Sequence, residues 1–174
     1  MAVVNTKSTA ITNLDAVPPQ LTNAAIAGAD KKISKALLSV AAADSDTSVY
    51  RVARVPSNAV IHSIRVLNDA ITGGTSYDLG VYDIAGTNSG AVVDADLFAS
   101  AVDLSSANTA WLELRYEAAT TAIIDYAEKT LWFILDVGAA TLSSDPNKQY
   151  DICFTANTVG TGAGDILCEV EWSV

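Results

Sequence analysis

The chain is poor in the side chains from which most catalytic sites are built, since its 174 residues include one histidine and two cysteines. The histidine, His62, lies in a valine-rich stretch, and no serine elbow or cysteine partner accompanies it in the sequence. Nucleophilic catalysis needs a base within hydrogen-bond reach of the nucleophile, so this class of activity has no visible candidate. We therefore expect a protein that is not an enzyme and binds no cofactor, with a structural role for His62.

The two cysteines, Cys153 and Cys168, form no CxxC motif and have no nearby histidine, so neither zinc binding nor redox chemistry is expected. Both lie in segments that alternate between apolar and polar residues, as the strands of a final hairpin would. On a shared core face, Cys168 points inward with Ile166 and Val170, whereas Cys153 points outward. We expect two free thiols and no disulfide between them.

Long apolar runs and basic residues are also scarce. No run approaches the roughly 20 residues that span a bilayer, so no membrane partner is expected. The start of the chain, "MAVVNTKSTAITN", lacks the continuous apolar core of a signal peptide, and secretion by that route is not expected. Ten basic against 20 acidic residues give a net charge of −10. Such a charge repels phosphate backbones, which argues against nucleic acid as a partner.

The composition changes once along the chain, near residue 30. Before that point, "TKSTAITNLDAVPPQLTNAAIAGAD" is small and polar and has no sustained period of 2 or 3.6. We expect residues 1–30 to form an extended arm and residues 31–174 to form one β-sandwich domain. Such an arm cannot offset its ordering entropy alone, but its scattered apolar residues can dock into a neighbouring protein. The predicted contact residues are Ile11, Leu14, Val17, Leu21 and Ile26.

After residue 30, short segments rich in apolar and β-branched residues are separated by turn residues. Eight of these segments are predicted strands, and eight strands predict an all-β protein with two antiparallel sheets packed as a sandwich. The predicted strands span residues 33–42, 48–55, 59–68, 76–84, 97–102, 110–115, 149–156 and 164–173.

Turn residues define where several of these strands end. Pro56 removes a ladder donor, which predicts either a hairpin or a corner between two sheets. Gly73-Gly74 mark the next reversal, after which Tyr77, Leu79 and Val81 alternate inward. This alternation predicts a half-buried strand.

One segment departs from the strand pattern. In "DYAEKTLWFILDVG", apolar residues recur at helical spacing, and Asp125 with Glu128 has the spacing of an N-cap and capping box. We predict one short helix near residues 125–136. The alternative is a buried strand over "TLWFILDV", whose residues are β-prone.

Two patterns are similar to ligand sites. Asp44 with Asp46, and Asp94 with Asp96, form D-x-D pairs, but calcium needs more oxygen ligands in a tight geometry. We expect solvated turns and no metal. The "GTGAG" of residues 160–164 is similar to a phosphate-binding loop, but it links two predicted strands instead of opening a helix. We expect a hairpin turn there.

Three stretches of the chain carry a resemblance to a known family. They are "YRVARVPSNAVIHSIRVLNDAITGGTSYDLGVYD", then "GAVVDADLFASAVDLSSA", then "EKTLW" followed by "LSSDPNKQYDICFTANTVGTGAGDILCEVEW". Together they resemble small virion structural proteins of tailed bacteriophages, of the capsid decoration or cement type, over about residues 30–174. The intervening "FILDVGAAT" is longer and more apolar than the family pattern, which leaves the end of the helix open.

The resemblance implies a jelly-roll-like β-sandwich that binds the outer surface of an icosahedral capsid. It implies that the protein bridges subunits of the major capsid protein, self-associates as a homo-oligomer, and has no active site. An acidic surface keeps a protein displayed in many copies soluble, and free cysteines suit assembly in the host cytoplasm.

A jelly-roll carbohydrate- or receptor-binding module of a virion fibre is the alternative function, because sheet faces and loops serve both. Such a module would expose coplanar aromatic rings, for which the candidates are Trp111, Tyr77, Tyr82 and Tyr116. We expect instead that the three tryptophans belong to the core, because aliphatic residues flank them. These are Trp111, Trp132 and Trp172.

Overall fold

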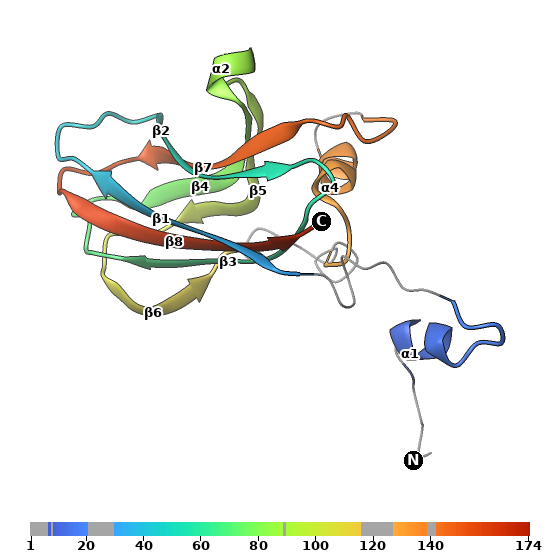
Figure 1. Cartoon of the computed structure of the whole chain (residues 1–174). Coiled ribbons are helices and arrows are strands. Elements are labelled where there is room, and N and C mark those ends of the chain that lie inside the picture. The colour runs from blue at the N-terminus through green and yellow to red at the C-terminus, as the bar shows by residue number, and fades with distance from the viewer. Residues whose placement is uncertain (1–6, 8, 21–29, 89, 116–126, 139–141) are drawn as a thin grey trace.

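A computed structural model describes residues 7, 9–20, 30–88, 90–115, 127–138 and 142–174 of the chain. Its eight strands form two four-stranded antiparallel sheets that pack face to face (Figure 1), which confirms the predicted sandwich. The first sheet has the order β1-β8-β3-β6, and the second has the order β2-β7-β4-β5. The strands are β1 (Lys32–Val40), β2 (Ser48–Pro56), β3 (Val60–Asn68), β4 (Ser76–Asp83), β5 (Val92–Val102), β6 (Asn108–Glu113), β7 (Gln149–Thr158) and β8 (Gly164–Ser173).

These two strand orders define a jelly roll. Except for β4 and β5, each pair of consecutive strands is divided between the two sheets. The turn after Pro56 is therefore a corner between sheets. The predicted hairpin turn at residues 160–164 is wrong, because β7 and β8 lie in opposite sheets. Two strands that face each other across a core show the same inward alternation as a hairpin, so the local sequence does not distinguish them.

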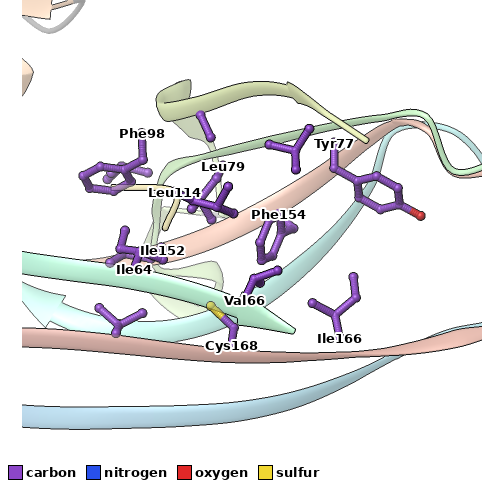
Figure 2. Packing of buried hydrophobic residues seen from close by; sticks show 14 of the residues in the cluster. Ile64, Val66, Tyr77, Leu79, Phe98, Leu114, Ile152, Phe154, Ile166 and Cys168 are labelled. Atoms are coloured by element: carbon purple, nitrogen blue, oxygen red, sulfur yellow. The ribbon is translucent and has the colours of Figure 1, made fainter. Parts of the chain in front are cut away.

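The core lies between the two sheets. Tyr77, Leu79 and Val81 of β4 point inward and are fully buried, as predicted. In Figure 2, Leu79 and Phe154 from the second sheet lie across the layer from residues of the first sheet such as Val66. Each buried side chain of this size contributes about 1.5–3 kcal/mol, so this shared layer holds the two sheets together.

Both cysteines are free, as predicted, and both are buried, although Cys153 was expected to point outward. Cys168 belongs to the core layer, whereas Cys153 lies on the other face of its strand, beside Arg51. Burial raises the pKa of each thiol to about 12. Because the thiolate is the reactive form, neither cysteine is primed for exchange or oxidation.

The segment predicted as a helix is helical, and α4 (Leu131–Gly138) covers one end of the core with Leu131 and Leu135. The helix starts later than predicted, since residues 127–129 form a turn and a bend. The N–H of Leu131 donates to the Ala59 carbonyl at 2.7 Å, and the N–H of Trp132 donates to the Ser57 carbonyl at 2.9 Å. Backbone carbonyls of the corner after β2 thus satisfy the first helix donors. Asp125, the predicted N-cap, lies outside the described residues.

The described residues contain two further short helices that were not predicted. α1 (Thr9–Leu14) lies within the segment expected to be extended, and Figure 1 shows it away from the two sheets. α2 (Ala85–Asn88) lies between β4 and β5. Helices of six and four residues are too short to produce a readable helical period. In the described part of the chain, no helix has the length and apolar character that a membrane span requires. The division into an arm and a domain stays a prediction.

An irregularity between β4 and β5 explains the presence of Gly80. Leu79 pairs with Ala99 and Val81 pairs with Asp94, so a short step along β4 corresponds to a longer stretch of β5. The extra residues fold against Gly80. A β-carbon at this position would lie 2.1 Å from the carbonyl oxygen of Asp94, so only glycine fits.

Replacing Gly80 with alanine should therefore lower the free energy of unfolding by about 1–3 kcal/mol, the usual cost of overpacking. Chemical denaturation of the purified protein measures this change. Gly86→Ala is the matched control, because a β-carbon there has no neighbouring atom within 4 Å. Equal stability of the two variants would contradict the close approach of β5 to Gly80.

Candidate interaction surfaces

The predicted contact residues of the arm are only partly described. Val17 is 98% exposed and Ile11 is 46% exposed, so both present apolar surface to solvent. Leu14 is the last residue of α1, while Leu21 and Ile26 lie outside the described residues. Lys7 pairs with Asp15 at 2.5 Å across α1. The docking of these residues into a neighbour stays a prediction.

The first D-x-D pair holds a turn. Asp44 accepts hydrogen bonds from the Ala41 N–H at 2.9 Å and from the Tyr50 hydroxyl at 2.7 Å, and these bonds lower its pKa. Asp46 accepts a bond from the Val159 N–H at 2.9 Å. The two carboxylates therefore fix the connection between β1 and β2 and join it to the end of β7.

The second D-x-D pair lies in the irregular part of β5. Burial, followed by the interaction with Asp96, raises the pKa of Asp94. Within the described ranges, no group of three or more His, Cys, Asp or Glu side chains is arranged to hold a metal ion.

We predict that removing divalent cations leaves the melting temperature unchanged, because a ligand that binds only the folded state would raise it by mass action. Scanning calorimetry with and without a chelator tests this. A reducing agent should likewise have no effect, because both cysteines are free. If a chelator lowers the melting temperature by many degrees, one of the D-x-D pairs binds a cation such as calcium.

His62 and the tryptophans lie at the margins of the core. His62 Nε2 is 2.8 Å from Ser173 Oγ, and burial lowers the pKa of the imidazole. Trp132 and Trp172 are half-buried, but Trp111 on the edge strand β6 is 42% exposed, so its predicted core position is wrong. The Arg65 guanidinium covers its ring, 5.4 Å from the centroid.

The aromatic residues proposed for a glycan platform do not lie together. Tyr77 is fully buried and Tyr82 is 7% exposed. The Tyr77 hydroxyl donates a hydrogen bond to the Val159 carbonyl, and the Tyr82 hydroxyl is hydrogen-bonded to the Thr155 hydroxyl. Tyr116 lies outside the described residues. Of these candidates, Trp111 alone is exposed in the part of the chain that the structure describes, and the Arg65 guanidinium lies over its ring.

A charged row crosses the outer face of the first sheet. Lys35, Glu169 and Arg65 stand opposite one another on β1, β8 and β3. Lys35 Nζ lies 2.8 Å from Glu169, and Arg65 pairs with both Glu169 and Glu171. The Glu169 side chain is 6% exposed, and the hydrogen bond from Lys35 is the main cause of its lowered pKa. Counted together with Glu171, two cations face two carboxylates, so the charges of the row are balanced by its own ion pairs.

An apolar row runs beside the charged one. Leu37, Leu167 and Leu67 are opposite one another on β1, β8 and β3, and Leu37 is 67% exposed. Together with polar residues that include Asn68, Asn108, Asp69 and Asp165, these leucines line a shallow groove of about 350 Å³. Contiguous exposed apolar surface marks interaction sites on soluble proteins, so this row is a candidate contact surface.

A cluster on the second sheet was missed by the sequence analysis. Arg51 Nη1 donates to Asp151 at 2.7 Å, and Arg54 donates to the same carboxylate through Nε at 2.7 Å. Residues three apart on a regular strand point to opposite faces. A register shift between Arg51 and Ala53 brings both arginines to one face. The motif "YRVAR" carries no visible signal of this bulge.

The cluster is a buried carboxylate with two cationic partners. The Asp151 side chain is 4% exposed, and its burial opposes ionisation. Hydrogen bonds from Arg54 and Arg51 outweigh that cost and hold the pKa of Asp151 below its usual value. A group whose folded pKa is lowered stabilises the fold above its unfolded pKa, and this contribution disappears as the pH falls.

Arg54→Met should therefore destabilise the protein at neutral pH, because it removes two hydrogen bonds to a buried carboxylate. The difference from the parent protein should shrink as the pH falls below about 4, the usual pKa of aspartate, and should vanish below the lowered pKa of folded Asp151, where the carboxylate is protonated in both proteins. Urea denaturation at a series of pH values measures this. A difference that is constant with pH would mean that Arg54 contributes packing instead of charge.

No protein-family model matches the chain, and no curated protein matches it. Two solved structures are similar in fold. A chain of the Ralstonia phage GP4 capsid is 10% identical, with a TM-score of 0.54 over 83% of this chain and 84% of that one. A chain of the capsid asymmetric unit of cyanophage Pam1 is 18% identical, with a TM-score of 0.48 over 84% and 86% of the two chains. At these identities the likeness concerns the fold.

Proposed function

We propose that this chain is a non-enzymatic structural protein of a phage virion. In this proposal it attaches to the outer surface of an icosahedral capsid and stabilises the capsid by bridging subunits of the major capsid protein. The observation that carries the proposal is the jelly roll that it has in common with a chain of the Ralstonia phage GP4 capsid. The sequence resemblance to decoration proteins supports the same assignment from different information.

Bridging requires contact surfaces that face different neighbours. The leucine row on the first sheet and the apolar residues Ile11 and Val17 of the predicted arm offer such surfaces on separate parts of the chain. Linking weak contacts raises the overall affinity because the second contact forms at a high effective concentration. A protein that cements a shell would use several weak contacts in this way.

The charge distribution favours attachment to a neutral or basic surface. The net charge is −10, and many of the described basic side chains are paired within the fold. These pairs include Lys35–Glu169, Arg54–Asp151 and Lys148–Asp83. The electrostatic potential around the protein is therefore negative, which keeps copies soluble and repels them from packaged DNA. The glycan-binding alternative lacks a comparable supporting feature, since the described aromatic candidates do not form a platform.

Deleting residues 2–30 should leave the sandwich folded and weaken attachment to the capsid, because an extended arm can wrap over neighbouring subunits. The expected result is an unchanged melting temperature together with faster loss from purified particles as salt is raised. In the intact protein, limited proteolysis should cut the arm in solution but not on the particle.

A finer version of this experiment uses Ile11→Ser with Val17→Ser, which removes exposed apolar surface without shortening the chain. Val92→Ser is the matched control, because Val92 is 58% exposed but lies on β5. If the truncated protein decorates particles with undiminished affinity and salt resistance, the arm is a linker and this attachment mechanism is lost.

A further inference from the structure

The four edges of the two sheets are not protected equally. A free edge exposes unpaired backbone groups and is usually blunted by bulges, proline, short length or charge. β2 has a bulge after Arg51 and ends in Pro56, β5 pairs with β4 through repeated register shifts, and β6 has six residues. β1 has none of these features, since its nine residues pair with β8 without a register shift.

The lysines of β1 do not protect its edge either. Lys35 is directed to Glu169 on the adjacent strand, and Lys32 lies over the Trp172 ring, 4.7 Å from the centroid. Among the described residues, β8 is the one strand that pairs with β1. β1 itself carries two exposed apolar residues, Ile33 and Leu37, at 55% and 67% exposure. β1 is thus long and regular, carries exposed apolar side chains, and has one edge that pairs with no strand of the described residues.

We propose that β1 pairs with β1 of a second copy of this chain, antiparallel and about a two-fold axis centred on Leu37. This inference deepens the self-association that the sequence resemblance implies. Opposite residues in an antiparallel pair point to the same face, so the axis passes through a residue that meets its own copy. The result is one continuous eight-stranded sheet from two copies, with an isologous interface.

The register follows from charge and shape. Centring the axis on Leu37 places Leu37 against its copy, so the two leucine rows join across the interface. Lys35 then lies opposite Ser39 of the second copy, whose hydroxyl donates to Asp165 at 2.7 Å, so each lysine gains a nearby carboxylate. Centring on Lys35 would set two lysines against each other, which is destabilising. Centring on Ala36 would set Lys35 against an apolar side chain.

The direct test is Leu37→Cys. Opposite residues in an antiparallel pair have Cα atoms about 4.5–5.5 Å apart, within the range that a disulfide bridges. Cys153 and Cys168 are fully buried, so they do not form intermolecular disulfides that would obscure the reaction of the introduced thiol. Under mild oxidation, Leu37→Cys should form a covalent dimer at least about tenfold faster than Val92→Cys, because pairing raises the effective thiol concentration.

A second variant measures the assembly without any cross-link. Leu37→Lys sets two like charges against each other at the axis, so light scattering at micromolar concentration should show a dimer for the parent protein and a monomer for this variant. Val92→Lys, an equally drastic change on an exposed valine of β5, should remain a dimer. Equal melting temperatures of the two lysine variants would exclude unfolding as the cause.

The outcomes separate this inference from attachment to the capsid. A parent protein that is monomeric, or cysteine variants that cross-link at equal rates, would overturn the pairing through β1 and leave the proposed function standing. A monomeric Leu37→Lys variant that still decorates particles would support the pairing and show that attachment does not need it.

Discussion

The whole structure depends on a single apolar layer to which both sheets contribute. Because all but one of the connections between consecutive strands cross from one sheet to the other, no sheet can form from neighbouring segments alone. Each strand must therefore present its apolar residues to strands that are distant in sequence. Tyr77 and Leu79 from one sheet and Ile64 and Ile166 from the other meet in this layer and are fully buried. Such long-range pairing is typical of slow-folding β-sandwiches.

The strands could be predicted because their alternation is local, and the observed bounds of all but β5 lie within two residues of the predicted ones. β5 begins five residues before the predicted start at residue 97, in the part whose pairing with β4 is irregular. The features that were predicted wrongly or not at all depend on residues distant in sequence. The start of α4 is set by the carbonyls of Ser57 and Ala59, and the exposure of Trp111 follows from the position of β6 at a sheet edge. The pairing of Arg51 and Arg54 with one carboxylate requires a bulge that no residue type marks. The membership of β7 and β8 in different sheets likewise has no local signal.

The surface divides into regions with different roles. On the outer face of the first sheet, the Lys35–Glu169–Arg65 row is occupied by its own ion pairs, while the neighbouring leucine row is open. On the second sheet, the Asp151 cluster stabilises an edge that β2 blunts with a bulge. A rigid core with few unprotected edges and a limited apolar contact surface suits a protein whose work is to bind neighbours. We therefore interpret the molecule as a component of an assembly.

The proposed place of this chain on the outside of a phage capsid can be tested by a cryo-electron microscopy map of the virus particle that carries it. We expect density for the two four-stranded sheets on the outer capsid surface, with each copy in contact with more than one major capsid subunit. Density for this fold at a tail fibre, and none on the shell, would rule out the proposed location and favour a receptor-binding role.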